Sequence, residues 1–90
     1  MKEIKWNPLK SERLKRTRGV SFEEIITAKL VSVQDHSRKE HQRIYLFEYK
    51  NYIWIVPFVE TENEIFLKTL YPCRKYTKVY KRGGNKNETD

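Results

Sequence analysis

Cationic and aromatic side chains are mixed near the C-terminal end of the chain. The run YPCRKYTK covers residues 71–78, and Tyr80 and Lys81 follow it closely. Arginine binds a phosphate group through two parallel hydrogen bonds, and tyrosine rings stack on nucleobases. The cluster therefore suits single-stranded RNA. A solvated basic terminus, with Tyr71 or Tyr76 packed in the core, is the alternative interpretation.

Cleavage of RNA without a metal ion requires three kinds of group. A base takes the proton of the 2′-hydroxyl, cations stabilise the charge that develops on the phosphate, and an acid protonates the leaving oxygen. The chain contains side chains for each role. The candidate catalytic residues are Arg74, Arg43, His36, His41 and Tyr76. The candidates for binding RNA are Lys75, Lys78, Tyr80, Lys81 and Lys15.

Several of these candidates also have an ordinary structural explanation. Arg43 stands at the start of a predicted strand, where it could form a salt bridge. His41 could be a polar surface residue in a loop. Glu48, at the end of a predicted strand, could act as a base, but a carboxylate paired at a strand edge explains it as well.

Other kinds of site find less support in the sequence. Two histidines and one cysteine do not build a zinc site of recognisable spacing. Asp35, His36 and His41 could hold an ion, but they lie in a polar segment that water solvates equally well. The glycines match no phosphate-binding loop. The cations beside Cys73 would favour its thiolate, yet a lone cysteine after a strand is more often a packing residue. We therefore expect neither a metal ion nor a cofactor.

The balance of charge indicates a polyanionic partner. A net charge of +7 on 90 residues gives a positive potential that attracts nucleic acid; a soluble basic protein, or one neutralised by an acidic partner, is the alternative. No apolar run approaches the roughly 18–20 residues that span a bilayer, and residues 1–10 lack the apolar stretch of a signal peptide. The single cysteine allows no intrachain disulfide. We expect a cytoplasmic protein without membrane contact.

The elements that must position these side chains begin with a strand and a helix. Residues 2–6 alternate as a short strand does. Asn7 offers an N-cap and Pro8 the favoured first position of a helix, which Gly19 ends near its C-cap. The last turn of this helix carries the cations Lys15, Arg16 and Arg18.

A second, short helix is predicted directly after the first. Ser21 and Glu24 have the spacing of a capping box, and Val20 is placed to pack against the start of the helix. The residues expected to press onto a sheet are Phe22, Ile25 and Ile26.

Strands make up most of the remaining chain. Residues 30–34 alternate as a strand, and residues 35–42 (DHSRKEHQ) are entirely polar and predict a loop that holds both histidines. Residues 44–49, 52–59 and 64–71 are rich in β-branched and aromatic side chains and predict an antiparallel meander.

The turns and the central strand of this meander can also be predicted. Lys50-Asn51 suits a two-residue hairpin turn, and residues 60–63 a polar turn. The run YIWIVPFV is apolar on both faces, which favours a central position. Pro57 lacks a ladder donor, so we expect a bulge there. Residues 74–81 can form a short basic helix or turn.

These elements predict an α+β fold, with two N-terminal helices packed on one face of a small antiparallel sheet. The length of the chain fits a single domain. We assign it to residues 1–82 and expect residues 83–90 to form a flexible polar tail.

Two motifs resemble the BrnT family of bacterial toxins. The pieces WNPLK (residues 6–10) and GVSFEEI (residues 19–25) are similar to a W-D/N-P-x-K start and a G-V-S/D-F-x-E-A segment. Asp35-His36 and Arg43 fall where the family has D-H and E-x-R-F/Y. YPCRKY resembles I-S-A-R-R-A/M, although Cys73 stands in place of an alanine. The likeness covers roughly residues 2–80.

The resemblance implies a RelE-like fold and a metal-independent endoribonuclease that arrests growth by cutting cellular RNA. It also implies a cognate antitoxin, often a ribbon-helix-helix protein, so that DNA is contacted only through the antitoxin complex. Arg74 would match the arginine of the terminal motif and Arg43 that of the E-x-R segment. A non-catalytic RNA-binding module, or a degenerate toxin, is the alternative.

Overall fold

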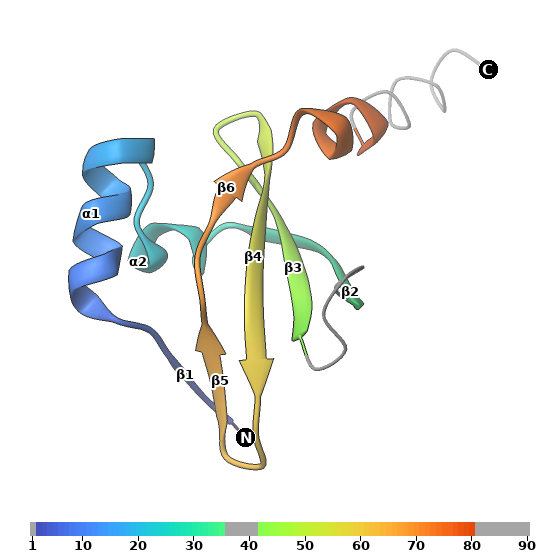
Figure 1. The fold of residues 1–90 in the computed structure, drawn as a ribbon. Helices are drawn as coiled ribbons and strands as arrows, with labels where there is room; N and C mark the ends of the chain where they lie inside the picture. Colours follow the sequence, from blue (N-terminus) through green and yellow to red (C-terminus); the bar gives the residue numbers. More distant parts are fainter. Residues whose placement is uncertain (1, 36–41, 81–90) are drawn as a thin grey trace.

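A mixed β-sheet with helices on both faces forms the protein, in a computed structural model that describes residues 2–35 and 42–80 (Figure 1). The strands are β1 (Glu3–Lys5), β2 (Lys29–Asp35), β3 (Gln42–Tyr49), β4 (Tyr52–Glu60), β5 (Glu64–Leu67) and β6 (Tyr71–Pro72). The helices are α1 (Pro8–Arg18) and α2 (Phe22–Ile25), and residues 74–80 are also helical. The predicted α+β class is confirmed. His36, His41, Lys81 and the predicted tail lie outside the described residues.

Helix α1 begins and ends where the capping residues predict. The Asn7 side chain accepts hydrogen bonds from the backbone N–H groups of Leu9 and Lys10, at 2.9 and 3.3 Å. Gly19 has a φ of 80°, in the left-handed region, and its N–H donates to the Lys15 carbonyl. The helix therefore ends directly after the turn that carries the cations Lys15, Arg16 and Arg18.

Helix α2 is shorter than its apolar pattern suggests. The capping box is confirmed, and Phe22 and Ile25 are fully buried. The expected burial of Ile26 is wrong, because the helix ends at Ile25 and Ile26 is the C-cap, with 36% of its surface exposed. Strand β2 then starts at Lys29, so the chain turns away before another helical turn can cover Ile26.

Strand β4 lies in the centre of the sheet, as its apolar run predicts. The strand order is β1-β5-β4-β3-β2, with β6 also paired to β4. Lys50 and Asn51 have φ values of 52° and 63° and form the tight turn between β3 and β4. This conformation suits the twist of two antiparallel strands.

Pro57 divides the strand that we expected over residues 64–71. The register of β3 with β4 runs unshifted through Ile44 and Pro57, so the predicted bulge is absent on that side of β4. On the other side, the pairing shifts by one residue between Phe58–Leu67 and Ile55–Tyr71. The Pro57 carbonyl accepts a hydrogen bond from the Lys68 N–H at 2.8 Å. The N–H and C=O of one residue in an antiparallel strand face the same neighbour. Since Pro57 has no N–H to return, the ladder stops there and resumes only at β6.

Strand β1 makes the sheet mixed rather than purely antiparallel, which corrects our expectation. It pairs in parallel with β5, and Ile4 lies opposite Ile65. An alternating pattern predicts a strand but carries no information about a partner some sixty residues away along the chain.

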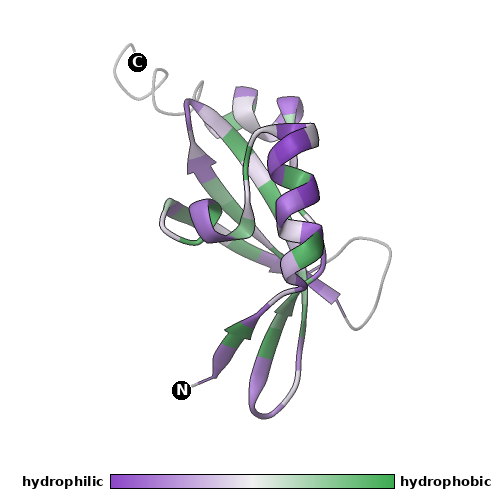
Figure 2. Ribbon diagram, turned by 90° about the vertical axis from the view of Figure 1, so that its left-hand side faces the viewer, coloured by the Kyte–Doolittle hydropathy of each residue, from purple (hydrophilic) through white to green (hydrophobic). Residues whose placement is uncertain are grey.

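The two faces of the sheet bury separate apolar clusters. Helices α1 and α2 cover one face, and α1 turns its polar side to solvent (Figure 2). The buried core on this face comprises Leu14, Val20, Phe22, Ile25, Phe47, Trp54, Val56, Phe58, Leu67 and Leu70. The second cluster consists of Ile44, Leu46, Ile53 and Ile55, and it packs against Val31, Tyr71, Cys73, Tyr76 and Tyr80. None of the described helices has the length and apolar character needed to cross a bilayer.

Candidate functional site

Three segments that carry basic residues lie at one end of the sheet, the upper end in Figure 1. Helix α1 ends there, the β3–β4 turn lies there, and the helical residues 74–80 begin there. We call this group the cationic end; its members are Lys15, Arg16, Arg18, Lys50, Arg74, Lys75 and Lys78. All seven are exposed to solvent.

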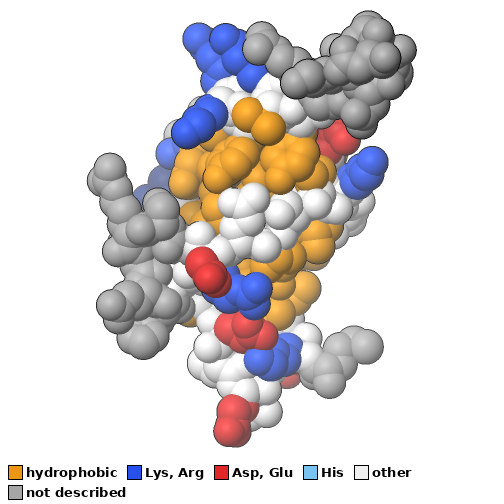
Figure 3. All heavy atoms as spheres, turned by 90° about the vertical axis from the view of Figure 1, so that its right-hand side faces the viewer, with side chains coloured by type: hydrophobic (Ala, Val, Ile, Leu, Met, Phe, Trp, Pro, Cys, Tyr) orange, Lys and Arg blue, Asp and Glu red, His pale blue; other side chains and the backbone are white. Residues whose placement is uncertain are grey.

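The opposite end of the sheet balances its charges in ion pairs. Lys2 lies 2.6 Å from Glu60, and Lys5 lies 2.7 Å from Glu64. Arg43 contacts carboxylate oxygens of Asp35 and Glu60 at 3.5 and 3.8 Å. In Figure 3, blue side chains predominate at the upper end, whereas red and blue side chains are mixed below. The excess of positive charge is therefore concentrated at the cationic end.

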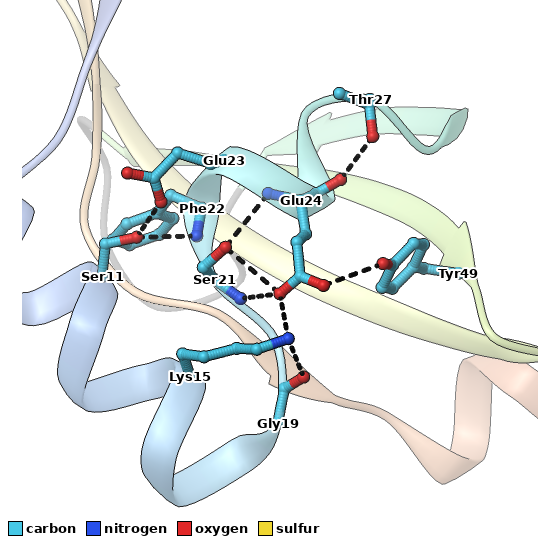
Figure 4. A network of polar contacts seen from close by, with 9 residues as sticks. All are labelled: Ser11, Lys15, Gly19, Ser21, Phe22, Glu23, Glu24, Thr27 and Tyr49. Atoms are coloured by element: carbon cyan, nitrogen blue, oxygen red, sulfur yellow. Dashed lines mark hydrogen bonds and ion pairs between the residues drawn. The ribbon is translucent and has the colours of Figure 1, made fainter.

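Glu24 anchors the end of α1 to the rest of the fold (Figure 4). One oxygen of its carboxylate lies 2.8 Å from the Lys15 ammonium group and accepts a hydrogen bond from the Ser21 N–H at 3.0 Å. The other oxygen accepts a hydrogen bond from the Tyr49 hydroxyl at 3.1 Å. The hydrogen bond from Lys15, followed by that from Ser21, lowers the pKa of Glu24 to about 2. Three elements thus meet at one ionised carboxylate.

Ser11 makes a second connection between α1 and α2. This residue is 1% exposed, and its hydroxyl accepts a hydrogen bond from the Phe22 N–H at 3.0 Å while it donates to Glu23. The hydrogen bond from Ser11 is the main cause that lowers the pKa of the Glu23 carboxyl. The Ser11 hydroxyl, the Phe22 N–H and the Glu23 carboxylate are therefore all hydrogen-bonded where α1 meets α2.

Residues 73–80 are held against the second cluster by one helical face. The Cys73 N–H donates to the Ile53 carbonyl, and the Ile53 N–H donates to the Thr77 hydroxyl, both at 2.8 Å. The Tyr76 hydroxyl donates to the Gln34 side chain at 3.2 Å. These contacts fix the inner face, and the outer face presents the cations Arg74, Lys75 and Lys78.

The structure brings together some of the predicted site residues. Arg74, Lys75 and Lys78 belong to the cationic end. The rings of Tyr76 and Tyr80 are half-buried, with 6.2 Å between their centroids. Lys15 also lies at this end, although its charge is partly offset by Glu24.

Arg43 lies apart from this group. Alternation along β3 places it on the face of Tyr45 and Phe47, which belongs to the first cluster, whereas residues 73–80 cover the other face. It lies at the end of β3 that is far from the Lys50 turn. The structure therefore does not join Arg43 to Arg74.

Arg16, Arg18 and Lys50 were not among the residues predicted to bind a ligand. Arg16 and Arg18 were identified only as cations that suit a helix C-terminus, and Lys50 only as a turn residue. The capping signals predict where the helix ends but not which part of the sheet lies beside it. Among residues 2–35 and 42–80, no group of three His, Cys, Asp or Glu side chains lies close enough together to hold a metal ion.

Comparison with known proteins identifies a shared fold. No family model matches the chain, and the curated proteins give no significant match. The structure is similar to the crystal structure of the Brucella abortus ribonuclease toxin BrnT, with a TM-score of 0.54 and 16% sequence identity. The likeness covers 81% of this chain and 97% of that chain. It confirms the fold that the motif resemblance implied.

Proposed function

We propose that this chain is the toxin of a toxin–antitoxin pair and acts as an endoribonuclease on cellular RNA. The observation that carries the proposal is the cationic end, which gathers exposed cations from three distant segments on a fold shared with a ribonuclease toxin. Cations that surround a phosphate stabilise the negative charge that develops on it during cleavage.

Arg74 is the residue that we assign to the scissile phosphate. It is the second residue after β6, its side chain is exposed, and the backbone of Cys73 beside it is hydrogen-bonded into the sheet. A planar guanidinium on a fixed backbone can hold phosphate oxygens in a defined direction. Lys75, Lys78 and Tyr80 would bind the neighbouring nucleotides. His36 and His41 stay candidates for moving protons, and no metal ion is required in this scheme.

The partner that we propose is a cognate antitoxin of the ribbon-helix-helix type. The toxin would then contact DNA only through the antitoxin complex, and both proteins would act in the cytoplasm, where their RNA substrate is. This part of the proposal is supported by the resemblance to BrnT toxins.

A non-catalytic RNA-binding module is the second candidate function. It is favoured by the position of Arg43, which is engaged by two carboxylates on the other face of the sheet. If both arginines were needed for cleavage, this arrangement would not supply them together. The second candidate predicts RNA binding that falls with salt and no cleavage products.

Tightly induced expression in a bacterial host tests the proposed function. We expect wild-type protein to arrest growth and Arg74→Ala to relieve the arrest while soluble folded protein remains. Lys68→Ala removes an exposed cation outside the cationic end and should still arrest growth, as should Arg43→Ala. If Arg43→Ala relieved the arrest and Arg74→Ala did not, the catalytic site would lie on the face of the sheet that carries Arg43. Unimpaired growth with wild-type protein present would favour the binding module.

A further inference from the structure

Tyr71 lies between two parts of the cationic end. The helical segment that begins with Arg74 follows it closely along the chain, and β6 is paired with β4 through Tyr71 and Ile55. Arg18, at the end of α1, is near enough for its positive charge to act on the Tyr71 phenol. The ring packs against the second cluster and is half-buried. A half-buried phenol thus lies near Arg18 and three residues before Arg74, which we assign to the scissile phosphate.

The hydroxyl group of Tyr71 makes no hydrogen bond with residues 2–35 or 42–80. The Tyr49 hydroxyl is hydrogen-bonded to Glu24, and the Tyr76 hydroxyl to Gln34. Among the described residues, none forms a hydrogen bond with the Tyr71 hydroxyl, and every buried side-chain N or O atom there has a partner. No described residue therefore takes up the Tyr71 hydroxyl, which can offer its proton to a ligand.

The surroundings of Tyr71 keep its phenol protonated. Burial raises its pKa above the ordinary value of 10.0, and Cys73 and Tyr76 act in the same direction, while Arg18 opposes them. A phenol of this kind carries its proton at neutral pH. It can give a proton to a strongly basic oxygen, but it cannot act as the base that starts the reaction.

We propose that Tyr71 is the proton donor to the leaving group in RNA cleavage. The inference rests on the ribonuclease activity proposed above and assigns a further catalytic residue to that site. The resemblance to BrnT toxins does not supply this role, because the family has an apolar residue where this chain has Tyr71.

The step balances without any cofactor. The 2′-oxygen attacks the phosphorus atom, its proton passes to a water molecule, and the bond between phosphorus and the 5′-oxygen breaks. The leaving 5′-oxygen takes the proton of the Tyr71 hydroxyl, and the phenolate regains a proton from solvent. Arg18, whose charge acts on the Tyr71 phenol, and Arg74, three residues further along the chain, stabilise the charge on the phosphate while the bonds change.

The test compares two substrates with Tyr71→Phe. One is an ordinary single-stranded oligoribonucleotide, and the other carries sulfur in place of the bridging 5′-oxygen at the cleaved bond, so its leaving group needs no proton. We expect Tyr71→Phe to cleave the ordinary substrate about 10²–10⁴-fold more slowly than wild type, the usual contribution of a general acid. It should bind that substrate normally and cleave the sulfur substrate at a rate close to that of wild type.

Tyr45→Phe is the matched control. Tyr45 is also half-buried, its phenol pKa is also raised by burial, and its ring stacks on Phe58 at 4.1 Å on the other face of the sheet. This variant loses the same hydroxyl and should keep wild-type rates on both substrates.

Three results decide between the possibilities. Normal cleavage of the ordinary substrate by Tyr71→Phe would overturn the inference and leave the ribonuclease intact. Equal slowing on both substrates would also overturn it, because the hydroxyl would then act on something other than the leaving group. Failure of wild-type protein to cleave either substrate would remove the proposed function itself.

Discussion

At the scale of single residues, Glu24 connects more of the fold than any sequence motif suggests. The capping box accounts for its contacts with Ser21, but its contacts with Lys15 and Tyr49 come from α1 and β3. A carboxylate that accepts several hydrogen bonds is stabilised in its charged form. This ionised group connects the end of α1, which carries Arg16 and Arg18, with α2 and β3.

Because of Glu24, the free energy of unfolding should decrease as the pH is lowered. Because its pKa is lowered from 4.5 to about 2 in the folded state, its contribution is present above pH 4.5 and is lost as pH falls toward 2. We expect Glu24→Gln to cost about 1 kcal/mol of unfolding free energy at pH 7 and to flatten this part of the pH profile. Urea denaturation at several pH values between 2 and 7 measures both effects. Glu62→Gln, at an exposed turn, is the control; an unchanged profile in Glu24→Gln would contradict the assignment.

At the scale of elements, the helical segment 74–80 is the part of the fold that brings Arg74 to its position. It is attached by backbone and hydroxyl contacts to the first residues of β4, rather than by a long helix–helix interface. Thr77 makes the central contact, because its hydroxyl accepts the hydrogen bond of the Ile53 N–H and donates to the Cys73 carbonyl at 2.7 Å.

Thr77→Val should loosen this attachment. The substitution keeps the shape of the side chain but leaves the N–H of Ile53, a residue 1% exposed, without its partner, which costs about 1–3 kcal/mol. Chemical denaturation would show the loss, and amide hydrogen exchange at Ile53 should become faster. Thr17→Val provides the control, since the Thr17 hydroxyl donates to the Arg13 carbonyl on the exposed side of α1. Equal stability of the two variants would show that the Thr77 contact does not hold the segment.

At the scale of the whole molecule, charge is distributed unevenly along the strands. Ion pairs neutralise Lys2, Lys5 and Arg43 at one end, while the cationic end carries an excess of positive charge. An RNA strand should therefore approach one end of the molecule, and its affinity should depend on salt through the phosphates that this end contacts.

The salt dependence of RNA binding tests this polarity. For wild-type protein we expect the logarithm of the binding constant to fall linearly with the logarithm of salt concentration. Lys75→Ala with Lys78→Ala should reduce the slope by about 1.4, since each contact with a single strand contributes about 0.7. Lys2→Ala with Lys5→Ala removes the same charge at the opposite end and should leave the slope unchanged. Equal slopes in both double variants would mean that RNA does not bind at the cationic end.

The helix caps and the hairpin turn could be predicted from the sequence because they depend on residues that are close together in the chain. Asn7, Gly19 and the Ser21–Glu24 capping box act on backbone groups within one helical turn, and all were confirmed. The Lys50-Asn51 turn was confirmed for the same reason. The basic run at residues 74–78 was also visible, since its members are adjacent, and its helical form was among the predicted alternatives.

Only the tertiary structure decided which distant segments meet. The parallel pairing of β1 with β5 and the break at Pro57 both depend on hydrogen bonds between residues far apart in sequence. The same holds for the cationic end, which forms because α1, the β3–β4 turn and residues 74–80 lie at the same end of the sheet. Periodicity records which side of an element is apolar, whereas the partner of that side is selected by the packing of the whole chain. Hence Arg74 could be identified from sequence as a candidate, but its position at the same end of the sheet as Arg18, and its separation from Arg43, could not.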